Sequence, residues 1–186
     1  MTMSTFKRIA VTNRSFCSAS LKEQVEKICN AGICDALILR EKDLAEQDYM
    51  SLAMSIKLIC DKHEIDLFCN NMPSAAERLG CNLQLSYQNF LDLKGKKDQE
   101  TWVSVHTVEE ARNAEKLGAD GLVAGHIFVT DCKKGLAPRG LDFLKEVCDA
   151  VSIPVFAIGG IDNSNSDIVR LAGAQGECRM SWYMRY

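Results

Sequence analysis

The stretch GADGLVAGHIFVTDCKKG (residues 118–135) carries the pattern that decides the fold. Its short apolar run at 121–125 is typical of a buried strand, and His126 and a polar loop follow the run at once. Ionisable side chains are rarely buried without a partner, so their place at the end of a strand needs a reason. The residues before the run, 108–119, have the length and composition of an amphipathic helix. The stretch therefore predicts a helix, a buried strand and a polar loop in succession.

The same succession repeats along the chain in both directions. Short apolar runs predict strands at 8–12, 36–40, 66–70, 83–86, 102–106, 121–125, 153–160 and 176–181. Amphipathic segments predict helices at 21–32, 46–64, 75–80, 108–119, 140–151 and 165–174. Strands that alternate with helices favour a parallel sheet, and eight such units favour a closed (β/α)8 barrel. We therefore predict an α/β fold, a small TIM barrel that forms a single domain over residues 1–186.

The last predicted strand differs from the others, because charged and apolar residues alternate along it. Glu177 and Arg179 share one face, and Cys178 and Met180 share the other. A covered barrel strand is normally apolar on both faces, so we expect the two charges to point outward, toward solvent or a partner chain. Only WYMRY (182–186) follows, which is too short for a closing helix. We expect a barrel without its final helix, and an apolar tail that favours a homo-oligomer, a dimer.

Composition argues against several classes of protein. The chain has 186 residues, of which 25% are charged and 47% hydrophobic, and its net charge is −3. It lacks the basic excess of a nucleic-acid-binding protein, a run of about 18 apolar residues that could cross a membrane, and the apolar core of a signal peptide. Its nine cysteines are scattered without a C-x-x-C pair, which favours buried thiols in a reducing compartment over a zinc site. We predict a cytoplasmic protein without nucleic-acid or membrane partners.

Active sites of (β/α)8 barrels lie at the C-terminal ends of the strands. The polar residues and glycines predicted at those ends are Arg40, Lys42, Asn70, Asn71, Gln84, Ser104, His106, His126, Thr130, Lys133, Gly159, Gly160 and Ser181. A single residue of this kind is more often solvated or structural than functional. Together, and with the positive charges of Arg40, Lys42 and Lys133, they favour an anionic ligand. The two glycines would let backbone N–H groups approach a phosphate closely.

Six motifs resemble, in order and spacing, those of one superfamily. They are LREK (39–42), VSVHTVEEA (103–111), GADGLVAGHIFVTDCKKG (118–135), RGLDFL (139–144), IPVFAIGGI (153–161) and MSW (180–182). By these motifs nearly the whole chain resembles the thiamine-phosphate synthase and TenI (thiazole tautomerase) superfamily. The resemblance implies a barrel that binds a phosphorylated thiazole. It implies a phosphate site at Gly159, Gly160, Ser181 and Trp182, and substrate contacts from Arg40, Lys42, Asn70, Gln84, Ser104, His106, Thr130 and Lys133.

The resemblance leaves the branch of the superfamily open. The synthase branch is a Mg²⁺-dependent transferase that joins a pyrimidine methyl diphosphate to thiazole phosphate and releases pyrophosphate. Mg²⁺ prefers carboxylate oxygens, and that branch places them after the third and fourth strands, where this chain has Asn71 and Asn89. A glutamine of that branch is replaced by Ile38. The two asparagines are therefore only weak candidate metal ligands, and only in a synthase.

The TenI-like branch matches the motifs more closely. Its members move a proton within a thiazole carboxylate phosphate without a metal, and Gly125-His126, the loop 130–135 and Gln84-Leu85 resemble that branch. Histidine titrates near neutrality, so it can both accept and donate a proton. We therefore predict a thiazole tautomerase without a cofactor, in which His126 is catalytic. A Mg²⁺-dependent synthase is the alternative, and a catalytically degenerate regulator that binds a phosphorylated ligand is the third possibility.

Overall fold

The computed structural model describes residues 6–93, 98–133 and 135–186, without the side chain of Cys132. Eight parallel strands close into a barrel in the order of the sequence. The strands are β1 (Lys7–Val11), β2 (Ala36–Leu39), β3 (Asp66–Asn70), β4 (Asn82–Ser86), β5 (Thr101–Val105), β6 (Gly121–Gly125), β7 (Val155–Ile158) and β8 (Gly176–Arg179). The predicted α/β TIM barrel is thus confirmed.

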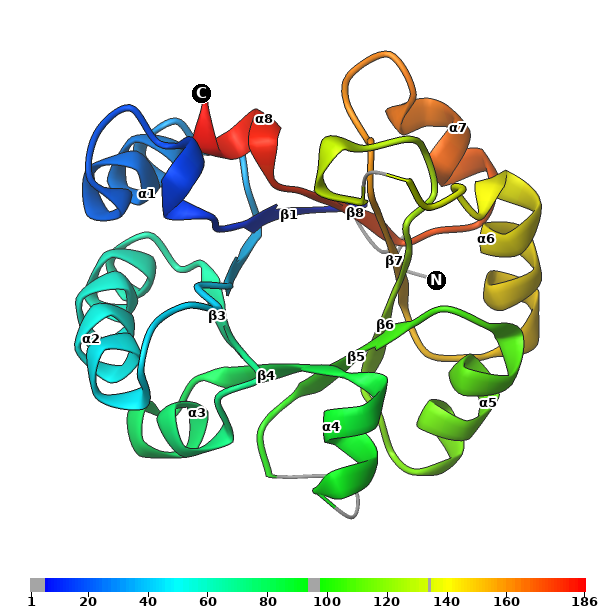
Figure 1. The fold of residues 1–186 in the computed structure, drawn as a ribbon, viewed down its shortest axis with the longest axis horizontal. Helices are drawn as coiled ribbons and strands as arrows, with labels where there is room; N and C mark the ends of the chain where they lie inside the picture. The colour runs from blue at the N-terminus through cyan, green and yellow to red at the C-terminus, as the bar shows by residue number, and fades with distance from the viewer. Residues whose placement is uncertain (1–5, 94–97, 134) are drawn as a thin grey trace. The chain divides into compact units, whose positions relative to one another are not determined.

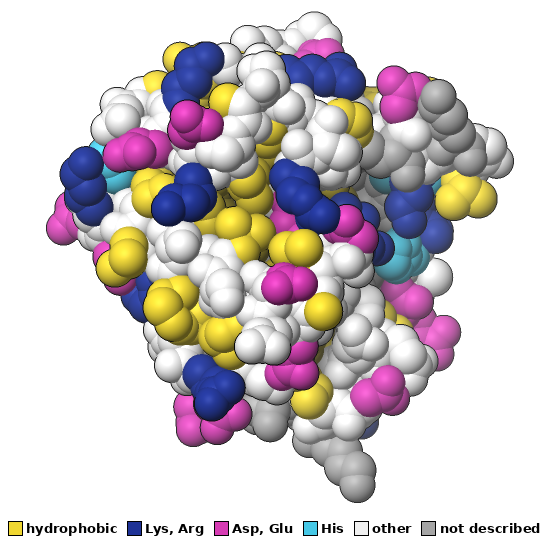
Figure 2. Space-filling model, turned by 60° about the vertical axis from the view of Figure 1, so that its left-hand side comes forward, with side chains coloured by type: hydrophobic (Ala, Val, Ile, Leu, Met, Phe, Trp, Pro, Cys, Tyr) yellow, Lys and Arg dark blue, Asp and Glu magenta, His cyan; other side chains and the backbone are white. Residues whose placement is uncertain are grey.

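Helices follow the strands as the sequence predicted, with short additions. The α-helices are α1 (Leu21–Asn30), α2 (Glu46–Lys62), α3 (Pro73–Leu79), α4 (Tyr87–Asp92), α5 (Val108–Lys116), α6 (Gly140–Ala150), α7 (Ser166–Leu171) and α8 (Ser181–Met184). The 3-10 helices are η1 (Arg14–Phe16) and η2 (Asp131–Lys133). Among the described residues, no helix is long and apolar enough to cross a membrane. On the face in Figure 2, lysine and arginine side chains lie interspersed with acidic ones.

The chain divides into two compact units, each made of two segments. The β1–β4 unit comprises Arg8–Gln84 and Met180–Tyr186, and the β5–β8 unit comprises the described residues within Met1–Lys7 and Leu85–Arg179. Within the β1–β4 unit, α1, α2 and α3 lie outside the strands (Figure 1). Within the β5–β8 unit, α5 and α6 lie outside theirs (Figure 1). Each unit therefore buries an apolar layer between its strands and its own helices.

The β1–β4 unit illustrates how the sequence specifies its elements. Helix α1 begins with a capping box, in which the Ser20 hydroxyl accepts from the Glu23 N–H and the Glu23 carboxylate accepts from the Ser20 N–H. Such reciprocal caps satisfy backbone donors that a helix leaves unpaired. The helix then buries Val25, Ile28 and Cys29.

Most cysteines of the chain lie in the core as expected. The buried ones are Cys29, Cys34, Cys60, Cys69, Cys81 and Cys178, and each of these is a free thiol.

Glycine permits close packing in the β5–β8 unit. Trp102 on β5 is paired in register with Gly121 on β6, and its ring lies 4.3 Å from the Phe156 ring, centroid to centroid. A Cβ atom at Gly121 would lie 2.8 Å from the Trp102 Cδ1 atom. That separation is far inside van der Waals contact. A side chain at position 121 would therefore displace the indole that fills this part of the core.

The largest difference from the predicted strands is in β7, and α4 is one of the short helices that the sequence did not predict. Strand β7 spans four residues, not 153–160, because Pro154 has no N–H to donate and because Gly159 and Gly160 have φ values of 103° and 66°. Those values lie outside the region of extended backbone. Helix α4 follows β4 directly and has only six residues. It is too short to show a helical period in the sequence.

Strand β8 corrects one expectation about its charged face. Glu177 and Arg179 point outward, as predicted, because the Glu177 carboxylate accepts from Ser166 at the start of α7, at 2.7 Å. The face is not wet, however: the two side chains are 4% and 7% exposed, and Arg179 Nη2 lies 2.5 Å from Glu177 Oε1. Arg179 also donates to Asn163 Oδ1 at 2.6 Å. The expected solvent or partner chain is replaced by a buried ion pair beneath α7.

Helix α8 follows β8 and has four residues. It lies beside α1 (Figure 1). The Tyr183 hydroxyl donates to the Ile33 carbonyl at 2.9 Å, and Gln24 Nε2 donates to the Tyr183 carbonyl at 2.7 Å. Tyr183 and Met184 are thereby buried within the β1–β4 unit. The burial of these two side chains removes one reason to expect a dimer, namely an exposed apolar tail. The dimer stays a prediction.

Candidate functional site

Three of the predicted polar residues lie at one level in the β1–β4 unit. Leu39 on β2 pairs with Cys69 on β3, so the residues after them, Arg40 and Asn70, come at the same height. Asn70 in turn pairs with Gln84 on β4. The backbone register thus aligns Arg40, Asn70 and Gln84 across three adjacent strands, as the sequence predicted for the C-terminal ends.

The two amides in this row bond to each other. Asn70 and Gln84 are both buried, and Asn70 Nδ2 donates to Gln84 Oε1 at 2.5 Å. Asn71 follows, and its N–H donates to the Gln84 carbonyl at 2.8 Å. Its φ is +52°, a left-handed conformation that asparagine and aspartate adopt more readily than other residues with a side chain. The amide pair fixes the orientation of both side chains, and Asn71 has a structural role besides any functional one.

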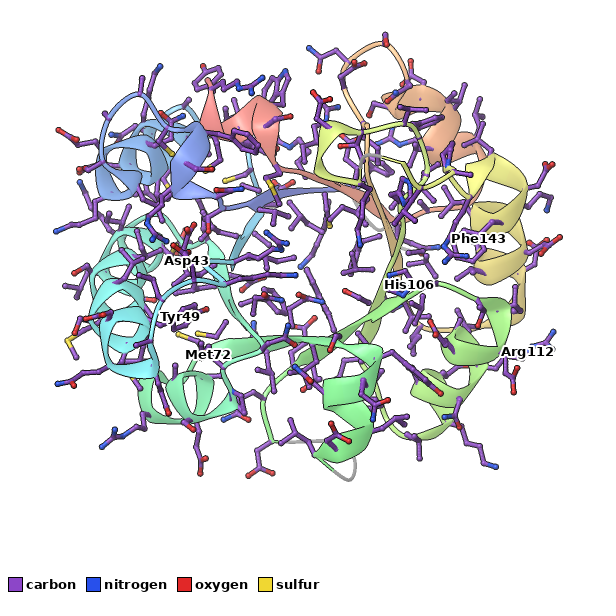
Figure 3. All side chains as sticks on the ribbon, viewed as in Figure 1. Asp43, Tyr49, Met72, His106, Arg112 and Phe143 are labelled. Atoms are coloured by element: carbon purple, nitrogen blue, oxygen red, sulfur yellow. The ribbon has the colours of Figure 1, made fainter. Side chains whose placement is uncertain are left out.

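Tyr49 is a residue of this site that the sequence did not indicate. It projects from α2 toward the strands (Figure 3), and it is 1% exposed. Its hydroxyl donates to the Leu39 carbonyl at 2.7 Å and accepts from the Asn70 N–H at 3.1 Å. Burial raises the pKa of the Tyr49 hydroxyl, so the group stays protonated and able to donate. Tyr49 therefore ties the end of β2 to the end of β3.

Replacing Tyr49 by phenylalanine is expected to lower the free energy of unfolding by about 1–3 kcal/mol, because two buried backbone groups lose their partner. The ring and its packing remain, so the effect belongs to the hydroxyl. Urea unfolding of the two proteins measures it. A matched control is Tyr87→Phe, since the Tyr87 hydroxyl accepts from the half-buried Asn113 side chain rather than from a strand end. Equal losses in the two variants would contradict the role given to Tyr49.

In the β5–β8 unit, His106 lies at the end of β5 (Figure 3), with Ser104 two residues before it on the strand. The His106 N–H donates to Glu110 Oε2 at 2.6 Å, and its ring Nδ1 lies 3.6 Å from the same oxygen. Burial lowers the pKa of His106, Glu110 opposes this, and the positive charges of Arg139 and Lys133 lower it further. His106 thus lies near two positive charges, those of Lys133 and Arg139, of which Arg139 was not predicted.

The lowered pKa of His106 predicts a dependence of stability on pH. The unfolded chain binds the proton more strongly than the folded one, so the contribution is full above pH 6.5, the ordinary pKa, and declines as the pH falls below it. The effect is small, because the side chain is 44% exposed and solvent screens its interactions. We expect His106→Asn to lose less stability than the parent between pH 7.5 and 5.5 in urea unfolding. The same loss in both would contradict this assignment.

His126 is held where the loop after β6 packs on the loop after β7. The Ile127 N–H donates to the Ile158 carbonyl at 2.9 Å, and the Phe128 N–H donates to the Gly159 carbonyl at 3.0 Å. A Cβ atom at Gly159 would lie 2.4 Å from the His126 Cβ atom, and one at Gly160 would lie 2.4 Å from the Val129 oxygen. The two glycines, predicted for a phosphate, are therefore also required by the packing of His126 and the residues after it.

The loop after β6 returns to His126. The Lys133 N–H donates to the Thr130 carbonyl at 3.1 Å, and the Arg139 N–H donates to the His126 carbonyl at 2.9 Å. The His126 Nε2 atom lies 3.4 Å from the Leu136 carbonyl oxygen, which is long for a hydrogen bond. Thr130, Lys133 and His126 thus belong to one compact loop, as the sequence predicted.

The remaining predicted residues lie in the first turns of two short helices, α8 and α4. Ser181 and Trp182 begin α8 in the β1–β4 unit, where the Trp182 ring meets the Tyr183 ring edge-on at 4.8 Å. Asn89 is exposed in the first turn of α4, and its N–H donates to the Ser86 hydroxyl at 3.3 Å. Their roles in phosphate or metal binding stay predictions.

The donor set does not fit a magnesium site built from protein carboxylates. In the described part of the chain, no group of three or more His, Cys, Asp or Glu side chains is placed to hold a metal ion. The side chains of Asn71 and Asn89 end in neutral amides. Glu41 stands between Arg40 and Lys42 in the sequence. Its two carboxylate oxygens already accept hydrogen bonds from Thr12 and Arg14. A Mg²⁺ ion that acts here would have to be held mainly by oxygens of a bound ligand or of water.

Comparisons with known proteins agree with one another. The family model described as thiamine monophosphate synthase matches residues 9–182. The thiamine-phosphate synthase of Clostridium tetani (strain Massachusetts / E88) is 36% identical over 134 residues, 68% of this chain and 63% of that protein. The putative thiamine-phosphate synthase 2 of Aquifex aeolicus (strain VF5) is 32% identical over 181 residues, 94% of this chain and 96% of that one. The solved thiamine phosphate pyrophosphorylase from Pyrococcus furiosus is 25% identical, with a TM-score of 0.84, over 98% of this chain and 89% of that chain.

Proposed function

The chain belongs to the thiamine monophosphate synthase family, and from this we propose that it is a transferase of thiamine biosynthesis. It joins a pyrimidine methyl diphosphate to a thiazole ethyl phosphate and releases pyrophosphate. Relatives that share 30% or more of their residues over most of this chain carry the name of that enzyme. The preferred sequence interpretation, a TenI-like tautomerase, receives no support from these names, so the synthase replaces it.

The observation that carries the proposal is the row at the end of β2, β3 and β4. Arg40 comes level with the buried Asn70–Gln84 amide pair, and Lys42 lies two residues further on, exposed. Departure of a diphosphate concentrates negative charge on the leaving oxygens. A guanidinium and an ammonium group stabilise such charge through charge-assisted hydrogen bonds. We assign Arg40 and Lys42 to the diphosphate.

In the β5–β8 unit, we assign the binding of the second substrate, the thiazole phosphate, to the residues around His106 and to the loop after β6. Support comes from the positive charges of Lys133 and Arg139 near His106 and from the left-handed glycines at 159 and 160. Phosphate groups bind favourably to such cations and to exposed backbone N–H groups. Ser104, His106, Thr130 and Lys133 keep the substrate-binding roles that the resemblance implied. This reaction needs no proton transfer by His126. Its role in the synthase is therefore structural, within the loop after β6.

A paired turnover assay tests the proposal. One reaction contains the pyrimidine diphosphate and the thiazole phosphate, with and without Mg²⁺, and is monitored for pyrophosphate and thiamine phosphate. The other contains the non-aromatic thiazole carboxylate phosphate without metal. We expect product in the first reaction only. Aromatisation in the second alone would restore the tautomerase with His126 as its acid and base. Binding of thiazole phosphate without turnover in either reaction would identify a regulator.

A further inference from the structure

A buried acid, Glu41, stands in the sequence between Arg40 and Lys42, the two cations assigned to the diphosphate. The Glu41 side chain is 2% exposed. Its Oε1 atom accepts from the Thr12 hydroxyl at 2.7 Å, and its Oε2 atom accepts from Arg14 Nη1 at 3.0 Å. The Arg14 N–H lies 3.1 and 3.2 Å from the two oxygens. Charged groups are rarely this buried unless they are fully bonded, and here the charge of Glu41 is met by Arg14.

Thr12 connects this acid to the backbone of the neighbouring cation. The Thr12 side chain is fully buried at the end of β1. Its hydroxyl donates its one proton to Glu41, and the same oxygen accepts from the Arg40 N–H at 2.9 Å. The Thr12 N–H donates to the Ile38 carbonyl at 3.0 Å. Because a hydroxyl has one proton and two lone pairs, the bond to Glu41 orients the oxygen toward Arg40.

We propose that Thr12 and Glu41 are positioning residues for diphosphate binding: the hydroxyl–carboxylate pair fixes the backbone at Arg40 and thereby the place of the Arg40 and Lys42 side chains. The inference rests on the proposed function, which assigns the diphosphate to those two cations. It follows that Thr12 and Glu41 affect the diphosphate and not the thiazole phosphate. Neither residue touches substrate.

Thr12→Val tests this, because valine keeps the shape of threonine and removes the hydroxyl. We expect the KM for the pyrimidine diphosphate and the Kd for inorganic pyrophosphate to rise about tenfold, as befits the loss of one buried hydrogen-bond partner. The KM for thiazole phosphate stays within about twofold of its value in the parent. Thr12→Ser keeps the hydroxyl and is expected to recover most of the affinity for pyrophosphate.

Asp43→Asn is the matched control. Asp43 (Figure 3) is a second, exposed partner of the Arg14 guanidinium: its Oδ1 atom accepts from Nη1 at 2.8 Å, and its side chain is 71% exposed. The substitution removes an exposed charge from Arg14 but leaves the bond from Thr12 to Glu41 and the bond from Arg14 to Glu41 available, so pyrophosphate affinity should stay within about twofold of the parent's. Should Thr12→Val fail to fold, Glu41→Gln takes its place, since it puts an amide where Arg14 needs a carboxylate. The same rise in the diphosphate KM is expected.

Calorimetric titration with pyrophosphate separates the possible failures, because it needs no turnover. A folded Thr12→Val protein that binds pyrophosphate as the parent does would overturn the positioning role and leave the proposed function intact. A rise in both KM values together would also overturn it, because it would show a general loss of structure. A parent protein that binds no pyrophosphate would overturn the proposed function, and the positioning role with it.

Discussion

Replacing Arg40 by alanine is expected to lower kcat/KM for the joining reaction by about 10²–10³-fold, the usual cost of removing one preorganised group that stabilises developing charge. Arg40 is half-buried, and the row with Asn70 and Gln84 fixes its height on the sheet. A guanidinium in that place can give two parallel hydrogen bonds to a diphosphate. Steady-state kinetics with varied pyrimidine diphosphate measure the effect.

Two further variants test whether the loss of activity is specific to the guanidinium at position 40. Arg40→Lys keeps the charge but loses the planar fork, so it should recover only part of the activity. Arg78→Ala removes an exposed arginine from the last turn of α3 and should change nothing. An Arg40→Ala protein with the kcat/KM of the parent would refute the assignment of the diphosphate to the end of β2.

Replacing Arg179 by methionine is expected to lower the free energy of unfolding by about 3–5 kcal/mol, because it leaves the Glu177 carboxylate buried without its charge partner. The pair is almost fully enclosed beneath α7. Ser166 donates to the Glu177 carboxylate, but one neutral hydroxyl does not replace a guanidinium. Urea unfolding at constant pH measures the loss.

Removing both charges provides the comparison. The double variant Glu177→Leu, Arg179→Met puts apolar side chains of similar size into the layer beneath α7, and such replacements are often neutral or stabilising. It should therefore be more stable than the single variant. Lys145→Met breaks a pair on α6 whose partners are both well exposed, and it should have little effect. A double variant as unstable as the single one would show that packing, not charge, is responsible.

The sequence predicted the fold well because the fold depends on local pattern. Strands β3 and β6 have the predicted bounds, and the helices begin within a few residues of their predicted starts. Helix α4 escaped notice because six residues are fewer than two helical turns. Alternation along β8 showed only that Glu177 and Arg179 share a face. Whether that face is wet depends on α7, which a pattern within β8 does not contain.

The candidate site was predictable in part for the same reason. Arg40, Asn70 and Gln84 could be found because each ends or lines a strand, and parallel strands end together. Tyr49 and Thr12 could not, because each acts through one hydroxyl that meets a backbone group 10 or more positions away. A tyrosine on a helix and a threonine after a strand give no sign of such a partner. The preference for the TenI-like branch rested on single side chains such as His126, whereas relatives that match most of the chain carry the names of synthases.

The contacts of α8 with α1 have a consequence for synthesis on the ribosome. Gln24 and Tyr183 are 159 positions apart in the chain, and Ile33 and Tyr183 are 150 apart. Most of the β1–β4 unit emerges first, yet the hydrogen bonds to Tyr183 and the burial of Met184 wait until the entire β5–β8 unit has been translated. Contacts between such distant residues form slowly. The nascent chain therefore carries an incompletely covered α1 while the whole β5–β8 unit is being translated, and the side chains that cover α1 follow only after that unit.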